Sequence, residues 1–305
     1  STNASAEKPV VISADVVAFK LPETNGPVQE IIAENNVVIS SESDQSRATG
    51  DKAVYTEATG ELELSGNPIW KIAQNEIRAD VLAIGRTNQF FSAKTNVYLK
   101  LPAKFFEKNL KMDATTNASA PTNRWVEIFC NDLLYATNVA RLTGNVRANL
   151  LDENDSLTTL LCDLANITFG PSNQVETVFA QKNVVLQEIP SATLQTNLLK
   201  KTVTCESLNL KRSLKTGLLE SIHAETQVVG EQLEKTKQGE ILKRISADSV
   251  NIKFSPTTNQ IQNVVAEGNV LRARLDVVDS DLLERRHRGK HARPVAAEER
   301  GLFFV

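Results

Sequence analysis

The residues best suited to chemistry in this chain are few. It contains three histidines, three cysteines and one methionine among 305 residues, which is little material for a metal centre or for imidazole catalysis. His223 is the only histidine outside the C-terminal tail, and no Gly-x-Ser-x-Gly motif accompanies it. We therefore expect no catalytic residue, no metal site and no cofactor.

Two further features resemble reactive sites only superficially. Lys215-Thr216-Gly217 matches one motif of penicillin-recognising enzymes, but the companion motifs Ser-x-x-Lys and Ser-Asp-Asn do not accompany it, so we interpret it as a turn. Cys130, Cys162 and Cys205 lack Cys-x-x-Cys spacing and take the place of a small residue in a repeated pattern. We expect them to be small buried hydrophobic residues, and a disulfide between two of them stays open.

Seven acidic or amide residues recur in equivalent surroundings. Each is the second residue of a hexad that reads small, acidic or amide, any, apolar, any, apolar: Asp15, Asp51, Asp80, Asn131, Asp163, Glu206 and Asp248. Such a series could form a catalytic row or a calcium ladder. However, these side chains readily accept hydrogen bonds from nearby backbone at a bend and tolerate unusual dihedral angles. We therefore interpret the seven residues as structural corners.

Side-chain parity predicts what the corners connect. Apolar residues fall at odd distances before the acidic residue and at even distances after it, and a period of two with one phase slip indicates a strand that bends. A second pattern, Asn or Gln followed by an apolar residue or Pro, follows each hexad by 14 to 21 residues. Its copies centre on Asn36, Asn67, Asn96, Asn145, Asn183, Gln227 and Asn269. The chain is thus a repeat of about seven strand-corner-strand units.

Composition agrees with an all-β fold. The formal net charge is −3, 41% of the residues are hydrophobic, and no apolar run of eighteen residues exists. Helical patterning is confined to 102–112 and, more weakly, 194–201. We expect an N-terminal β subdomain over 1–111, a linker or surface loop over 112–123, a C-terminal β subdomain over 124–276 and a basic, disordered tail over 277–305.

The alternation of these two patterns resembles a known family. Hexads such as Ala79–Ile84 alternate with Leu-x-Gly-Asn segments such as Leu64–Asn67 and Leu142–Asn145, as in the OstA-like family of periplasmic lipopolysaccharide-transport proteins. The resemblance extends from about residue 10 to residue 275. It implies an elongated β-jelly roll, an open twisted sandwich, built as one body or as two tandem subdomains. It also implies a periplasmic location, with a signal or membrane anchor upstream of Ser1 left open.

The resemblance further implies a non-enzymatic lipid carrier, whose apolar interior shields the acyl chains of lipopolysaccharide. The candidate groove-lining residues are Val17, Phe19, Tyr55, Leu82, Ile84, Leu133, Tyr135, Ile167, Leu208, Leu210, Val250 and Ile252. Expected partners are lipopolysaccharide or a related lipid, other OstA-like jelly-roll proteins bound through edge strands near residues 10–14 and 264–275, and further copies of the chain in a head-to-tail oligomer.

Two alternatives stay open beside the lipid carrier. Repeated Asn and Asp corners also suit a carbohydrate-binding or adhesive β-solenoid, and exposed edge strands suit a structural, self-assembling β filament. Nucleic acid is not an expected partner, because the repeated part of the chain is acidic and lacks interleaved basic and aromatic residues.

Overall fold

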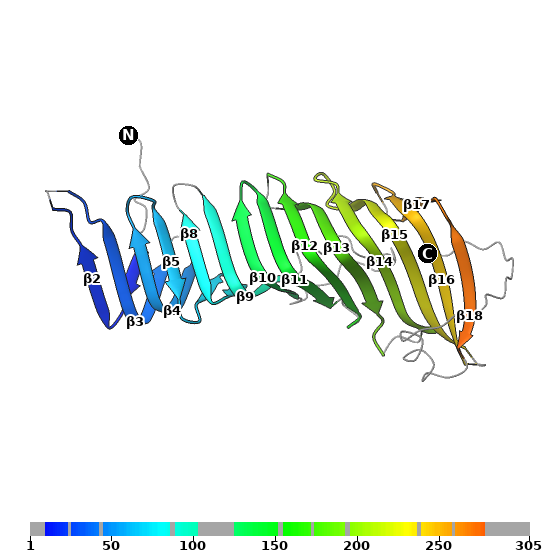
Figure 1. Cartoon of the computed structure of the whole chain (residues 1–305), viewed down its shortest axis with the longest axis horizontal. Coiled ribbons are helices and arrows are strands. Elements are labelled where there is room, and N and C mark those ends of the chain that lie inside the picture. The colour runs from blue at the N-terminus through cyan, green and yellow to red at the C-terminus, as the bar shows by residue number, and fades with distance from the viewer. Residues whose placement is uncertain are drawn as a thin grey trace. The chain divides into compact units, whose positions relative to one another are not determined.

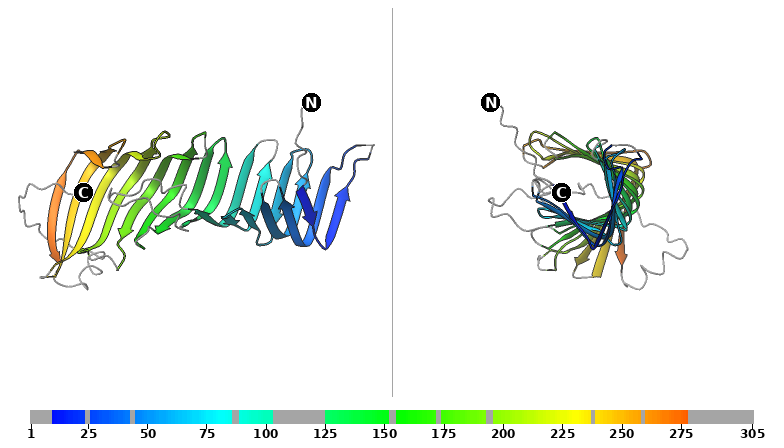
Figure 2. Two further views of the ribbon diagram at one scale, coloured as in Figure 1. Left: turned by 180° about the vertical axis from the view of Figure 1, so that it is seen from behind. Right: turned by 90° about the vertical axis from the view of Figure 1, so that its left-hand side faces the viewer.

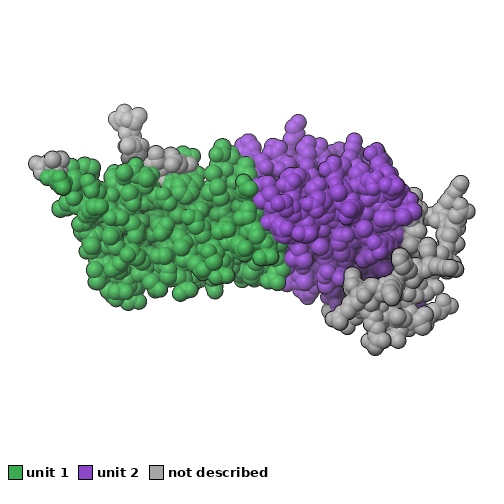
Figure 3. All heavy atoms as spheres, viewed as in Figure 1, with its two compact units in different colours: residues 1–102, 125–147 green, residues 103–124, 148–305 purple. Residues whose placement is uncertain are grey.

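The computed structural model describes residues 10–277 except 24–25, 43–44, 86–88, 103–124, 152–154, 172–173, 193–195, 237–238 and 258–259. These residues contain eighteen strands and no helix, so the expected all-β fold is confirmed. In the same part of the chain, no helix could cross a membrane. The described residues divide into two compact units, which Figure 3 distinguishes by colour.

Unit 1 comprises the described residues up to 102 together with 125–147. Its strands are β1 (Val10–Ser13), β2 (Val16–Lys20), β3 (Glu30–Ser41), β4 (Ser46–Thr56), β5 (Glu61–Ser65), β6 (Ile69–Ile72), β7 (Asn75–Arg78), β8 (Val81–Gly85), β9 (Phe90–Pro102), β10 (Trp125–Ala136) and most of β11 (Val139–Leu151).

Two sets of antiparallel pairings run through unit 1, and the strands can be followed in Figure 1. One set has the order β1-β3-β4-β6-β7-β9-β10, and the other has the order β2-β3-β4-β5-β8-β9-β10. The long strands β3, β4, β9 and β10 belong to both sets because each of them bends. In each of the pairs β1/β2, β5/β6 and β7/β8, the two short strands are the halves of one strand that is interrupted where the long strands bend.

Unit 2 comprises the described residues from 148 onward. Its strands after β11 are β12 (Leu157–Phe169), β13 (Val175–Ile189), β14 (Leu198–Arg212), β15 (Leu219–Thr236), β16 (Gly239–Phe254), β17 (Ile261–Glu267) and β18 (Leu271–Val277). Strands β12 to β16 pair with their neighbours in chain order, and β17 and β18 pair with the two halves of β16. Figure 2 shows the same strands from two further directions.

The bends have a local cause in the second pattern. At each of its seven copies two consecutive residues have positive φ: Asn35-Asn36, Gly66-Asn67, Thr95-Asn96, Gly144-Asn145, Lys182-Asn183, Thr226-Gln227 and Gly268-Asn269. Left-handed residues interrupt the extended backbone of a strand and turn its direction, and Gly and Asn adopt this conformation at the lowest cost. At the bend, the strand that contains the left-handed residues has one residue more than its partner. Gln181 and Val184 of β13 are three residues apart, whereas their partners Ser207 and Cys205 of β14 are two residues apart.

One of the two helical expectations was wrong where the structure describes it. Residues 198–201 begin β14, where Leu198 and Lys201 pair with Glu234 and Gln232 of β15, so cross-strand pairing overrides a weak helical pattern. In the other segment, Pro102 ends β9 and the remainder lies outside the described residues.

The predicted linker and the tail from residue 278 onward also lie outside the described residues. The strands that flank the linker, β9 and β10, pair with each other, and the compact units divide within β11 between Arg147 and Ala148. The subdomain boundaries given above stay a prediction. All the pairings named here are antiparallel, which rules out a parallel β-solenoid for these strands.

Candidate functional site

Two rows of hydrophobic side chains cross unit 1 on one face of the strands paired in the order β2-β3-β4-β5-β8-β9-β10. Direct cross-strand partners present their side chains on the same face, so each row is continuous. The proximal row lies two residues beyond the hexad acids and contains Val17, Ala33, Ala53, Leu64, Leu82, Ala93 and Leu133. The distal row lies four residues beyond them and contains Phe19, Ile31, Tyr55, Leu62, Ile84, Phe91 and Tyr135.

Unit 2 carries the same two rows. Its proximal row contains Ala165, Ala180, Leu208, Ala224, Val250 and Ala266. Its distal row contains Ile167, Val178, Leu210, Ile222, Ile252 and Val264. Both rows are hydrophobic at every position, and in both units the proximal row next to the bend holds the smaller side chains.

The structure places each of the predicted groove-lining residues in one of these rows, in three states of exposure. Leu82, Leu133, Ile167 and Leu208 are buried. Tyr55, Ile84, Tyr135, Leu210, Val250 and Ile252 are half-buried. Val17 and Phe19, on the edge strand β2, are exposed by 41% and 59%. The half-buried and exposed residues are the ones that solvent reaches, and contact with a lipid stays a prediction for all of the candidate residues.

The sequence reasoning missed the distal-row residues that lie on the alternate strands. These are Ile31, Leu62, Phe91, Val178, Ile222 and Val264. Each of them lies five residues before the Asn or Gln of its second pattern. That fixed distance was the signal that could have identified them.

A third hydrophobic row crosses the first set of strands in unit 1. This opposite row contains Ile12, Ile39, Ala48, Trp70, Ile77, Leu99 and Ile128. The rings of Trp70 in this row and Phe91 in the distal row lie 5.3 Å apart between centroids. The bend therefore folds the sheet of unit 1 into two layers whose apolar faces meet.

The hexad acids contact the second pattern at the bends. The amide nitrogens of Asn36, Asn96, Asn183 and Asn269 donate to Asp15, Asp80, Asp163 and Asp248, at 2.8 to 3.4 Å. At two other bends the acid or amide packs against a left-handed glycine, Asp51 against Gly66 and Asn131 against Gly144. Glu206 is exposed on β14. The two sequence patterns thus meet in space, while the corner role of the acids stays a prediction.

The cysteines are buried thiols at the bend level. Burial, with a smaller effect of neighbouring acids, raises the pKa of Cys130 to about 12 and the pKa of Cys205 to about 11. Burial also raises the pKa of Cys162 to about 11, although backbone hydrogen bonds with Gln181 and Leu164 lower it in part. Cys162 lies on β12 and Cys205 on β14, with β13 between them. Two strand spacings amount to about 9.6 Å, which exceeds the roughly 7 Å that a disulfide can bridge. These two cysteines therefore cannot pair in unit 2.

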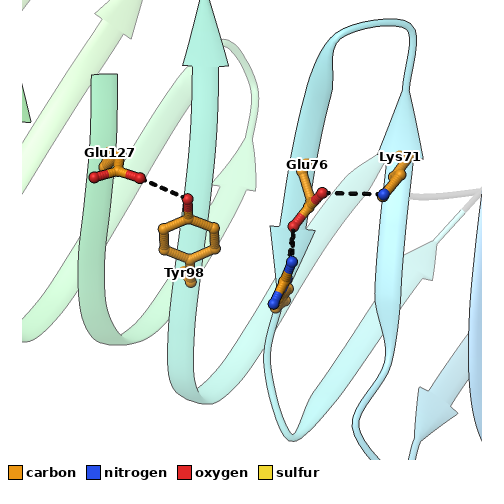
Figure 4. Close-up of polar contacts among 5 residues, drawn as sticks. Lys71, Glu76, Tyr98 and Glu127 are labelled. Carbon is orange, nitrogen blue, oxygen red and sulfur yellow. Dashed lines mark hydrogen bonds and ion pairs between the residues drawn. The ribbon is translucent and has the colours of Figure 1, made fainter. Parts of the chain in front are cut away.

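The outer surface of unit 1 carries polar contacts that Figure 4 shows at close range. Glu76 accepts from Arg78 and pairs with Lys71 at 3.2 Å; burial raises its pKa, but these two cations outweigh that effect and lower it overall. The hydroxyl of Tyr98 donates to Glu127 at 2.8 Å, and burial together with this bond raises the pKa of Tyr98 to about 12. The Lys71–Glu76 and Tyr98–Glu127 contacts join neighbouring strands, whereas Arg78 and Glu76 both lie on β7.

The Lys215-Thr216-Gly217 motif and His223 have ordinary surroundings. Lys215-Thr216-Gly217 lies in the turn between β14 and β15, where the Gly217 amide donates to the Ser213 carbonyl at 2.7 Å. His223 lies on β15 with its Nε2 2.8 Å from a carboxylate oxygen of Glu225. The hydroxyl of Ser207 donates to the other carboxylate oxygen of Glu225 at 3.4 Å, so this serine contacts the acid and not the imidazole.

Comparison with protein families gives a match over residues 9–90, to the family described as LptA/(LptD N-terminal domain) LPS transport protein. This match confirms the OstA-like resemblance over residues 9–90. The matched segment contains β1 to β8 and the first residue of β9. The matched family implies involvement in lipopolysaccharide transport, and it is a periplasmic family. A comparison with curated proteins gave no match.

Proposed function

We propose that this protein carries lipopolysaccharide through the periplasm by shielding its acyl chains between the folded layers of the sheet. The observation that supports this is the continuity of the hydrophobic rows, which no charged or amide residue interrupts along the strands named for either unit. Because each CH₂ group kept from water contributes about 0.8 kcal/mol, an unshielded lipid with several chains would cross an aqueous compartment too slowly to be useful.

The dimensions of the rows suit this role. In unit 2 the distal row crosses the six strands β12 to β17, which at about 4.8 Å per strand spacing gives roughly 24 Å. One leaflet of a bilayer core is about 15 Å thick, which is the length of one acyl chain. A row is therefore long enough to contact one acyl chain along its whole length. No catalysis is needed, and a partner that spends energy must set the direction of movement.

Edge strands supply the proposed connection to partners. In unit 1, β1 and β2 pair with β3, and their residues Val10, Val16 and Phe19 are exposed by 49% to 59%. In unit 2, β17 and β18 pair with β16. Unpaired backbone groups at such edges recruit strands from other sheets. We propose that other jelly-roll proteins of this kind, or further copies of this chain, extend the hydrophobic rows by joining there.

A photocrosslinking experiment tests the lipid-carrier proposal. A photoreactive residue replaces Leu210, which is half-buried in the distal row, and in a matched control it replaces Lys211, the exposed next residue of β14. Lipopolysaccharide should crosslink at position 210 and not at 211. Equal crosslinking at both positions would contradict acyl-chain shielding. So would deacylated lipopolysaccharide that competes for position 210 as strongly as intact lipopolysaccharide. The second result would favour a carbohydrate-binding protein.

A further inference from the structure

The contact between Trp70 and Phe91 crosses the interior of unit 1. The position of Leu99 shows how far apart the two rows would be without a bend. Leu99 lies on the same strand as Phe91, and it lies in the opposite row, two strand spacings from Trp70. Eight residues separate Phe91 from Leu99, so a straight β9 would hold them about 27 Å apart. The observed ring separation is 5.3 Å with a tilt of 56°. Only the bend at Thr95-Asn96 can bring these two rings together.

This contact leaves no room for a lipid chain between the two rings. Aromatic rings whose centroids are about 4.5–7 Å apart are in direct contact, so the 5.3 Å pair closes the interior where it stands. Both residues are nevertheless half-buried, not fully buried. The closed position is therefore next to space that solvent, and hence a ligand, can reach.

The two units differ in the side chains that fill this level. In unit 1 the distal row includes four aromatic residues: Phe19, Tyr55, Phe91 and Tyr135. In unit 2 every member of the distal row is Ile, Val or Leu. Its opposite row, from Leu160 through Leu186 and Val203 to Gly230 and Ile245, is also without aromatic residues. Unit 2 carries aromatic residues farther from the bend, where Phe169 and Phe254 follow Ile167 and Ile252 by two residues and Phe254 is 4% exposed. The ring contact at the distal row is thus a property of unit 1.

We propose that Trp70 and Phe91 form a barrier that determines how much acyl chain unit 1 admits, and that a chain enters by displacing the Trp70 ring. Trp70 is the more movable partner because it lies on the four-residue strand β6, whereas Phe91 lies on the thirteen-residue strand β9. This inference rests on the proposed function. It adds that the two units differ in capacity, because the ring pair restricts the distal row of unit 1 and the distal row of unit 2 contains no such pair.

Tryptophan fluorescence provides a direct test, because the chain has only two tryptophans. Trp125 packs under Lys100 at 4.8 Å, and Trp125→Phe leaves Trp70 as the sole emitter. Lipid A with brominated acyl chains, which quench tryptophan on contact, is titrated against the same lipid without bromine. We expect loss of most of the Trp70 emission with the brominated lipid alone. Phe91→Ala should tighten lipid binding about threefold to tenfold, because no ring contact has to be broken.

A photoreactive residue at position 210 reports lipid in unit 2 during the same titration. Crosslinking at 210 without quenching of Trp70, even at saturating lipid, would show that no acyl chain displaces the ring, which overturns the proposed entry into unit 1 and leaves the proposed function intact. Failure of lipid to bind at either position would overturn both. Phe91→Leu, which keeps the interior apolar and filled, is the second variant if Phe91→Ala does not fold, and binding no tighter than in the unsubstituted chain would contradict the inference.

Discussion

Replacing Gly66 by alanine should damage unit 1 more than its small size suggests. Gly66 has φ of +76°, and a Cβ atom added there would lie 2.4 Å from Cβ of Asp51. An L-residue in the left-handed region costs roughly 1–2 kcal/mol. Overpacking adds about 1–3 kcal/mol, and it cannot be avoided by rotating the Asp51 side chain, because the clashing atom is fixed to the backbone.

The free energy of unfolding should therefore fall by roughly 2–5 kcal/mol in Gly66→Ala. In a thermal melt followed by circular dichroism, the midpoint should fall by roughly 5–15 °C. Thr95→Ala is the matched control, since Thr95 occupies the same position at the next bend with φ of +60° and already carries a Cβ atom. We expect this control to change stability by less than about 0.5 kcal/mol.

A second substitution separates the two contributions. Asp51→Gly in the Gly66→Ala background removes the clashing Cβ atom but leaves the left-handed alanine, so it should recover part of the lost stability. If Gly66→Ala and Thr95→Ala melt at the same temperature, or if Asp51→Gly recovers nothing, then close contact between the two sequence patterns does not hold the bend, and the reasoning fails.

Three further outcomes follow from the packing. Leu208→Ala should lower the free energy of unfolding by roughly 2–5 kcal/mol in a urea titration, and Leu210→Ala by clearly less, because Leu208 is 1% exposed and Leu210 is half-buried; equal losses would contradict the distinction between the rows. Purified protein should show no intramolecular disulfide in unit 2 by mass spectrometry, and its thiols should react with a thiol reagent at pH 7 only when denaturant is added. The Tyr98 hydroxyl should ionise near pH 12, as followed by ultraviolet absorbance. Because the folded pKa lies above the usual value of about 10, the stability contributed by Tyr98 should be complete below about pH 10 and be lost between about pH 10 and 12, and Glu127→Gln should move the ionisation back toward the usual value.

The strands and their faces could be predicted from the sequence because side-chain parity is a local property. The even spacing after each hexad acid placed Leu82 and Leu133 on the buried face and Ile84 beside them. Only the row residues on the strands with a hexad were predicted. Those on the alternate strands were missed, since the strands that precede the second pattern lack a hexad. Phe91 and Ile222 were missed for that reason, although their distance from Asn96 and Gln227 is the same. Pairing with β15 likewise made residues 198–201 a strand despite their helical pattern.

The amino-acid sequence by itself determined where this protein bends and which side chains share a face, because left-handed Asn or Gly residues and a period of two act within a few residues. Only the tertiary structure decided what those faces meet. The contact of Trp70 with Phe91 depends on residues two strands and one bend apart, and the separation of Cys162 from Cys205 depends on the strand inserted between them. Such relations arise from register and from the angle of the fold, which no local pattern specifies.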